Sequence, residues 1–192
     1  MSLENHIEDA LARLRPFTGL QAAPVMEKLT VRTLKKGEFL LAPPKVCSFA
    51  ALVLRGSFRM FRNTGEKDNT LHFFTEGDWV GDMESFTVQK PTVNYIQAME
   101  KAELATLTIH ALHELIHRDP SFLALGRIMK EWSVPSAHYT SLINDSPDER
   151  YQTLLKAHPD WILRFPQMHL ASYLGMSRET FSRVKRRNMV IC

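Results

Sequence analysis

Cysteine is scarce in this chain of 192 residues, which contains only Cys47 and Cys192. Two thiols cannot supply a four-cysteine zinc or iron–sulfur site within one chain, and no CxxC pair is present. Sparse, widely separated cysteines are typical of free thiols in a reducing compartment. The sequence therefore predicts neither a disulfide scaffold nor a cysteine-held metal centre.

Long apolar runs are also lacking. No segment approaches the about 20 apolar residues that a membrane-spanning helix needs. The charged N-terminus MSLENHIEDALARLRPF has no apolar signal-peptide core. With 44% apolar and 23% charged residues, the composition is that of an ordinary globular protein of one domain or two small ones. We expect a cytoplasmic protein with no membrane partner.

The chain as a whole has no large excess of either positive or negative charge, but its C-terminal end has an excess of basic residues. Residues 1–145 contain 16 Lys and Arg against 17 Asp and Glu, whereas residues 146–192 contain 8 against 4. Five of these basic residues fall within ten positions, at Arg178, Arg183, Lys185, Arg186 and Arg187. A basic cluster at one end of a nearly neutral chain indicates a polyanionic partner.

The first half of the chain has the texture of a β-protein. Residues 5–17 have helical spacing of apolar residues, but residues 25–109 contain short runs rich in β-branched and aromatic residues, such as FAALVLR and TLHFF. Glycines separate these runs and indicate hairpin turns, as in Arg55-Gly56 and Asn63-Thr64-Gly65. The pattern predicts a β-sandwich or β-roll.

The second half reads as helical. A short helix is expected over residues 111–117, and Asp119-Pro120 is typical of the start of another that extends to about Ile143, with an interruption at Pro135. A long apolar-faced helix in this position either packs on its own sheet or pairs with a copy of itself. Ser146, followed by Pro147 and Glu149, predicts a capped helix start.

Residues 167–186 have helix-turn-helix spacing. A first helix over 167–174 contains the small Ala171, which allows a second helix to approach closely. Gly175 permits a sharp turn with positive φ, and Ser177 is placed to cap the second helix. Leu170, Leu174, Met176, Phe181 and Val184 supply the packing between the two helices.

The outward face of the second helix suits the major groove of DNA. Arg can hold guanine through two hydrogen bonds, Glu can accept from the cytosine amino group, and hydroxyls can contact phosphates. The predicted DNA-binding residues are Gln167, Ser177, Arg178, Glu179, Thr180, Ser182, Arg183, Lys185 and Arg186.

The run LGMSRETFSRVKR, residues 174–186, resembles the recognition helix of the cyclic-AMP receptor protein and FNR (Crp/Fnr) family of bacterial transcription regulators. The resemblance implies that Arg178, Glu179 and Arg183 contact base edges. Further upstream, KKGEFLL, LVLRGSFRMF and EGDWVGDMESF resemble the glycine-marked strands of the family's cyclic-nucleotide-binding β-roll.

The resemblance implies an α+β fold in three parts. An antiparallel β-roll, similar to a cyclic-nucleotide-binding domain, would occupy residues 1–118, a long dimerisation helix 119–145, and an all-α helix-turn-helix domain 146–192. Because only residues 187–192 follow the recognition helix, the β wing usual in the family is expected to be truncated. The expected partners are double-stranded DNA, a second copy of the chain and RNA polymerase, with no cofactor or metal and no enzymatic activity.

The sensor half departs from the family pattern. Cyclic-AMP-binding members have a phosphate-binding cassette with Gly-Glu and, about ten residues on, Arg-Ser; here the cassette has Gly81, Asp82 and Met83, and then Thr92 and Val93. Without the Arg, a buried phosphate has no bidentate partner, so we expect no ordinary cyclic-AMP binding. An unidentified small-molecule effector in this degenerate pocket remains open. Iron–sulfur sensing is disfavoured by the few cysteines, and haem sensing by the single strand histidine His72.

A competing motif points to a different class of protein. His113-Glu114-Leu115-Ile116-His117 matches HExxH, in which two histidines one helical turn apart share a zinc ion and the Glu acts as base. The alternatives are therefore a zinc hydrolase acting through His113, Glu114 and His117, or a ligand-binding module whose helical end binds a protein. The sequence does not identify an effector or an operator, and it does not show whether the protein would activate or repress transcription.

Overall fold

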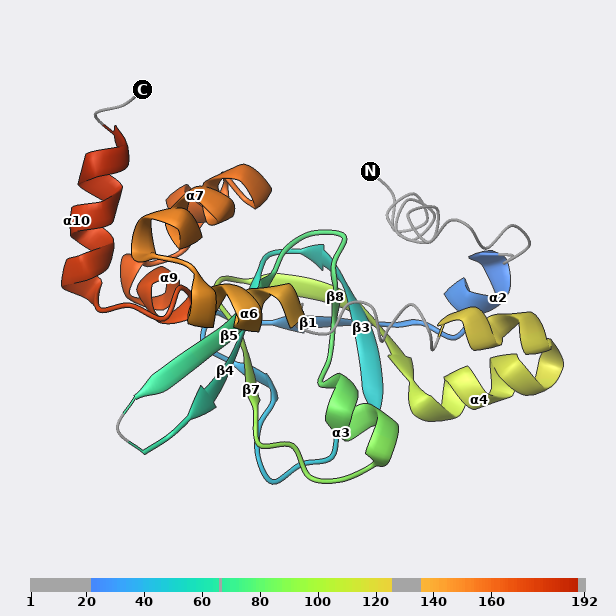
Figure 1. The fold of residues 1–192 in the computed structure, drawn as a ribbon. Helices are drawn as coiled ribbons and strands as arrows, with labels where there is room; N and C mark the ends of the chain where they lie inside the picture. Colours follow the sequence, from blue (N-terminus) through green and yellow to red (C-terminus); the bar gives the residue numbers. More distant parts are fainter. Residues whose placement is uncertain (1–21, 66, 126–135, 190–192) are drawn as a thin grey trace. The chain divides into compact units, whose positions relative to one another are not determined.

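The computed structural model describes residues 22–65, 67–125 and 136–189, which fall into two compact units. The first unit lies within residues 1–61 and 73–133, and the second within residues 62–72 and 134–192. Figure 1 shows the elements of each. The predicted helix over residues 5–17 lies outside the described residues, as do residues 126–135 of the predicted dimerisation helix and the tip of the predicted wing, residues 190–192.

Two antiparallel four-stranded sheets lie within the first unit, apart from their residues between 62 and 72, which fall in the second unit. One sheet has the order β1-β8-β3-β6 and the other β2-β7-β4-β5. The strands are β1 (Thr30–Leu34), β2 (Phe39–Leu41), β3 (Phe49–Arg55), β4 (Phe58–Asn63), β5 (Asp68–Phe74), β6 (Trp79–Val80), β7 (Tyr95–Ala98) and β8 (Ala102–Thr108). The prediction of an antiparallel β-roll within an α+β fold is confirmed.

The apolar runs of the sequence explain the core of this unit. In β3, five consecutive residues from Ala50 to Leu54 are buried, and the strand pairs with β8 on one side and β6 on the other. A central strand with no solvent-facing side reads as a continuous apolar run rather than an alternating one. The predicted turns at 55–56 and 63–65 connect β3 to β4 and β4 to β5.

Short helices complete the first unit: α2 (Ala22–Met26), α3 (Met83–Val88), α4 (Ile109–Arg118) and the 3₁₀ turn η1 (Pro120–Phe122). The expected short helix over 111–117 is present as α4, capped by the Thr108 side chain. Asp119 does cap the next element, since its carboxylate accepts from the Ser121 N–H at 2.9 Å. That element begins as a 3₁₀ turn rather than directly as an α-helix.

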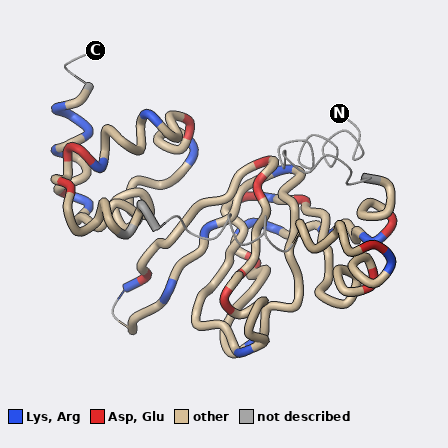
Figure 2. Tube along the Cα trace, turned by 45° about the vertical axis from the view of Figure 1, so that its right-hand side comes forward, with Lys and Arg blue, Asp and Glu red and all other residues tan. Residues whose placement is uncertain are grey.

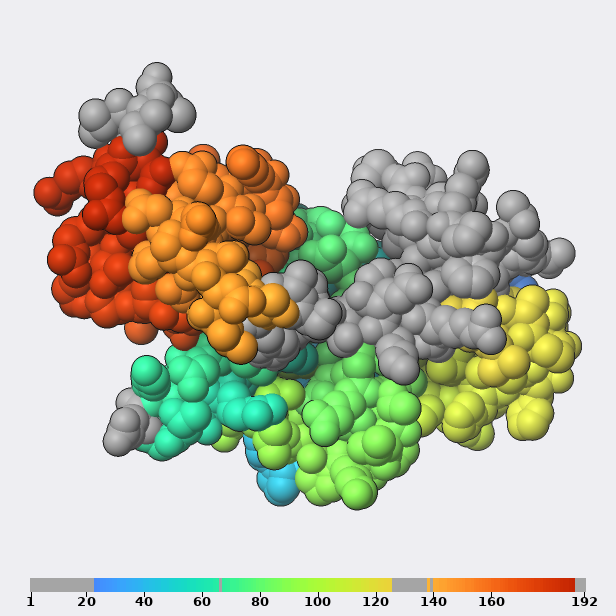
Figure 3. Space-filling model, viewed as in Figure 1, coloured from blue at the N-terminus to red at the C-terminus, as the bar shows by residue number. Residues whose placement is uncertain are grey.

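Five helices lie in the described part of the second unit: α6 (Ser136–Asn144), α7 (Pro147–Ala157), α8 (Trp161–Arg164), α9 (Gln167–Tyr173) and α10 (Arg178–Met189). The predicted capping box opens α7: the Glu149 N–H donates to the Ser146 hydroxyl, and the Glu149 carboxylate accepts from the Ser146 N–H. Trp161, Tyr151 and Phe181 are its largest fully buried side chains. Figure 3 shows the side chains of α7 and α10 packed together.

Residues 68–72 of β5 also belong to the second unit. The hydroxyl of Ser172 in α9 accepts from the Thr70 N–H and donates to the Asp68 carbonyl, both at 2.9 Å. His72 packs edge-on against Trp161, with ring centroids 5.6 Å apart. Burial lowers the pKa of His72 to about 4, and the nearby imidazoles of His158 and His138 contribute further.

Candidate nucleic-acid interface

The turn between α9 and α10 is built as the sequence predicts. Gly175 has φ of 61°, in the left-handed region that side chains disfavour. Ala171 is buried in α9. The contact between α9 and α10 includes Leu170, Phe181 and Val184, each of which is fully buried. The two helices therefore meet with the close approach that a helix-turn-helix requires.

Ser177 caps helix α10. Its hydroxyl accepts from the Thr180 N–H at 3.2 Å, and the Arg183 guanidinium lies 3.4 Å from the Thr180 hydroxyl. The pKa of Glu179 is lowered, first by a hydrogen bond to its own backbone N–H and then by the Ser177 hydroxyl and the charges of Arg178 and Arg183. Glu179 is therefore ionised at neutral pH and can accept hydrogen bonds from a base edge.

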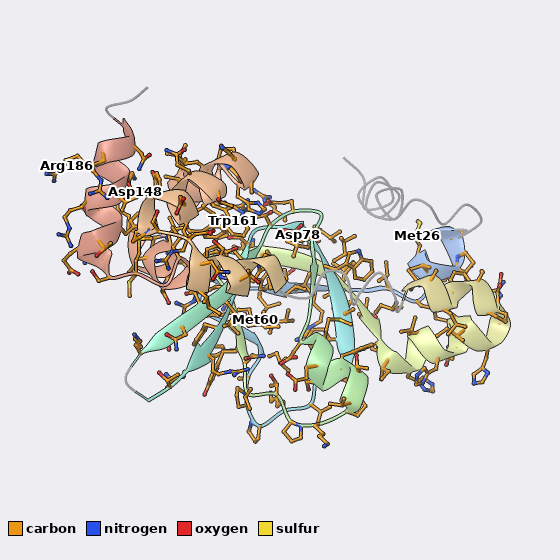
Figure 4. All side chains as sticks on the ribbon, viewed as in Figure 1. Met26, Met60, Asp78, Asp148, Trp161 and Arg186 are labelled. Carbon is orange, nitrogen blue, oxygen red and sulfur yellow. The ribbon has the colours of Figure 1, made fainter. Side chains whose placement is uncertain are left out.

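The predicted DNA-binding residues are all at least partly accessible on this helix pair. The side chains of Thr180 and Lys185 are half-buried, and the others are exposed: Gln167, Ser177, Arg178, Glu179, Ser182, Arg183 and Arg186. Lys and Arg residues gather along α10 in Figure 2, and Figure 4 shows Arg186 pointing outward from the helix. The nine residues include four basic side chains and one acidic one, so the accessible groups carry a net positive charge.

Sequence reasoning missed the residues that hold the far end of α10. Asp148, on α7, pairs with Arg187 and accepts from the Asn188 amide at 3.3 Å. The Gln152 amide donates to the Asn188 side chain. These contacts span more than 35 residues of sequence, so no local pattern could have revealed them. Figure 4 marks Asp148 on α7, beside α10.

Arg150 supports the turn itself. Its Nη1 donates to the Leu174 carbonyl at 2.5 Å and lies 3.4 Å from the Gly175 carbonyl. Carbonyls at the end of a helix lack intrahelical donors, and a cation there is favourable. Arg150 therefore satisfies the carboxyl end of α9 just where the chain turns toward α10.

The segment that resembles a phosphate-binding cassette, in the first unit, is held by hydrogen bonds among its own residues. Asp82 is buried and caps α3 by accepting from the Ser85 N–H at 3.1 Å. Its other oxygen accepts from the Thr92 hydroxyl and from the Asn94 amide, the latter at 3.0 Å. Thr92 and Asn94 are also buried. Where the resemblance would place an arginine and a phosphate, the structure has a carboxylate bound by neutral donors.

The remaining cassette residues are only partly drawn into this arrangement. Gly81 and Met83 are half-buried next to Asp82, but Val93 is 56% exposed and faces solvent. Of the predicted pocket residues, the structure therefore brings Asp82 and Thr92 together and leaves Val93 outside. Ser85, which the sequence did not single out, accepts from the Cys47 N–H at 2.9 Å and donates to the Lys90 carbonyl at 2.5 Å.

The HExxH motif lies on α4, and its Glu has other partners. Glu114 pairs with Lys28, and it also lies 3.0 Å from His110. The pKa of Glu114 is lowered, chiefly by the Lys28 hydrogen bond and charge. Among the residues that the structure describes, no group of three His, Cys, Asp or Glu could hold a metal ion. The same residues include no helix that is both long and apolar enough to cross a membrane.

Comparison with known proteins agrees with this architecture. Residues 31–119 match the cyclic nucleotide-binding domain family. FixK2 from Bradyrhizobium japonicum superimposes with a TM-score of 0.71 at 15% identity, over 84% of this chain and 85% of that one. The regulator CLP of Xanthomonas campestris gives 0.68 at 18% identity, over 88% and 90%. The catabolite activator protein of Thermus thermophilus gives 0.53 at 24% identity, over 89% and 84%. A search of the curated proteins gave no match.

The predicted resemblance is therefore confirmed at the level of domain and fold. Residues 31–119 are similar to the cyclic nucleotide-binding domain family, and the chain shares its fold with FixK2, CLP and the catabolite activator protein.

Proposed function

We propose that this chain, with its cyclic nucleotide-binding domain fold and C-terminal helices, is a sequence-specific DNA-binding transcription regulator of the Crp/Fnr type. The observation that carries the proposal is the geometry of α9 and α10. A positive-φ glycine, a capping serine and a buried helix contact present Arg178, Glu179 and Arg183 on one exposed surface. Helices of this kind contact base edges in the major groove.

Selection of an operator from random duplexes, followed by fluorescence anisotropy, tests this function. Arg183→Ala should weaken binding to the selected duplex by about 1–3 kcal/mol and relax specificity at one position. Lys36→Ala removes the same charge from the exposed β1–β2 turn of the other unit and serves as the control, with unchanged affinity expected. Failure to enrich any duplex, or equal losses for both variants, would contradict the proposal.

We further propose that the regulator does not respond to cyclic AMP. A phosphate entering the cassette would meet the buried carboxylate of Asp82, and no Arg stands at position 92 to compensate its charge. Calorimetric titration with millimolar cyclic AMP should give no binding heat. Micromolar binding would show that the cassette rearranges to admit the nucleotide. Another effector in this domain is compatible with the proposal.

The regulator should act as a homodimer, because sequence-specific contacts from one short helix are few and two recognition helices would span two half-sites. Light scattering of the full chain should give the mass of a dimer at micromolar concentration, and a monomer alone would oppose this part of the proposal. RNA polymerase, as a partner, stays a prediction of the family resemblance.

A further inference from the structure

A cavity of about 250 Å³ lies within the second unit, among helices α6, α7 and α9. It is separate from the cyclic nucleotide-binding domain and includes none of the predicted DNA-contacting side chains. Its size is just below the about 300 Å³ at which sites for drug-sized ligands begin. The cavity is therefore suited to a small molecule rather than to a nucleotide or a peptide.

Apolar and aromatic side chains form one part of the cavity wall, and Ser141, Thr153 and His158 add polar groups to it. The His138 ring stacks on the Tyr173 ring, with centroids 4.0 Å apart and planes 9° from parallel. Burial lowers the pKa of His138, against the opposing effect of a hydrogen bond to the Tyr173 backbone, and the nearby Arg150 charge lowers it further. Leu142, Leu154 and Leu174 complete the apolar lining. A flat, apolar ligand body would find a matching surface here.

Arg150 contributes the one guanidinium in this lining, and no carboxylate among the described residues pairs with it. Its Nη1 bonds to two backbone carbonyls, which are neutral. Its Nε is buried, and within the described ranges neither a hydrogen-bond acceptor for that atom nor a carboxylate paired with the side chain is found. A partly desolvated guanidinium with only neutral partners favours an added anion, and a carboxylate can meet its planar edge through two hydrogen bonds.

We propose that this cavity binds a small organic monocarboxylate with a flat apolar body, such as an aromatic acid. The carboxylate accepts from the edge of Arg150 that the carbonyls of Leu174 and Gly175 leave unused, and the ring lies against the His138–Tyr173 pair. Because Arg150 also holds the turn before α10, the ligand would bias the position of the recognition helix. That last consequence rests on the proposed DNA-binding function; the binding itself does not.

Calorimetry on the full chain, without DNA, tests the site with benzoate and with benzyl alcohol. The two probes share a ring and differ in charge. We expect one benzoate per chain, and an affinity for benzyl alcohol that is lower by about tenfold or more, since a charge-assisted hydrogen bond is lost. Equal affinity for the two probes, or no benzoate binding, would overturn the proposal.

Two variants place the ligand in the cavity. Ala157, at the end of α7, lines the cavity and is exposed, so Ala157→Phe should fill the entrance and abolish benzoate binding. Met168→Phe adds an aromatic ring at an exposed position of α9 outside the lining and should bind benzoate as the wild type does. Undiminished binding by folded Ala157→Phe would refute the assignment. Because these titrations contain no DNA, a failure to bind benzoate would not contradict the DNA-binding proposal. A failure to bind DNA would likewise not contradict the proposed benzoate site.

Discussion

Gly175 offers the sharpest test of how the helix-turn-helix is held together. Its φ of 61° lies in the left-handed region, and a Cβ added there would stand 3.0 Å from both the Arg150 Nη1 and the Leu142 Cδ2. Gly175→Ala therefore combines backbone strain with crowding of two side chains. Gly175→Asn adds the same Cβ, but Asn tolerates the left-handed conformation better than Ala does.

Three contributions determine how much Gly175→Ala should destabilise the second unit. A left-handed conformation costs an L-residue about 1–2 kcal/mol. Replacing glycine also lowers the conformational entropy of the unfolded chain, which stabilises the folded state by about 0.4–1 kcal/mol. Displacing Arg150 from the Leu174 carbonyl weakens a hydrogen bond from a charged group, which contributes about 1.5–3 kcal/mol when intact. Partial displacement puts Gly175→Ala at about 2 kcal/mol of destabilisation, and Gly175→Asn should recover about half of it because its conformational cost is smaller.

Urea denaturation followed by far-ultraviolet circular dichroism measures these differences through the helical second unit. The transition of the β-rich first unit serves as an internal reference and should not move. If Ala and Asn destabilise equally, the conformational argument is wrong and only crowding matters. If neither destabilises, Gly175 is not held at positive φ.

Two further predictions concern buried groups. Asp82→Asn should destabilise the first unit by about 2 kcal/mol, because an amide cannot accept from Thr92, Asn94 and a backbone N–H as a carboxylate does. Glu84→Gln changes an exposed residue of the same helix and serves as the control, with an unchanged denaturation midpoint expected. His72 has a pKa lowered from 6.5 to about 4, so in the folded state the imidazole is protonated at a lower pH than in the unfolded state. The second unit should thus lose up to about 3 kcal/mol as pH falls from 6.5 to 4 and none above that range. This slope should shrink in His72→Phe, and a slope equal to the wild type's would exclude His72 as its source.

Features encoded by neighbouring residues could be predicted from the sequence. The capping box at Ser146 and Glu149 requires only three residues of separation, and the turn at Gly175 requires only that a residue without a Cβ stand between two apolar-spaced helices. Such local preferences act before the chain is compact and are rarely overridden when several agree. The β-roll was predictable for a similar reason, since β3 is apolar from Phe49 to Leu54.

Features that depend on distant residues could not be predicted. The sequence shows that Thr92 stands where an arginine is expected, but it does not show that Thr92 and Asn94 both donate to Asp82, ten and twelve residues earlier. Nor does it show that Arg150 reaches the end of α9. These contacts are set by tertiary packing, which fixes side-chain partners across turns of unknown geometry. Their consequence is functional, because they determine which charges are left for a ligand.

The basic cluster of α10 illustrates the same limit within one helix. Arg186 and Arg187 are adjacent and chemically identical, so composition counts both toward a nucleic-acid surface. In the folded unit they differ: Arg186 extends outward from the helix, while Arg187 pairs with Asp148 of α7. An exposed ion pair contributes little stability by itself, but with the Asn188 bonds it fixes the end of α10 against α7. Binding of Arg187 to a phosphate would require giving up that contact. If α10 binds DNA as proposed, the charge that it can use without such a cost therefore resides in Arg178, Arg183, Lys185 and Arg186.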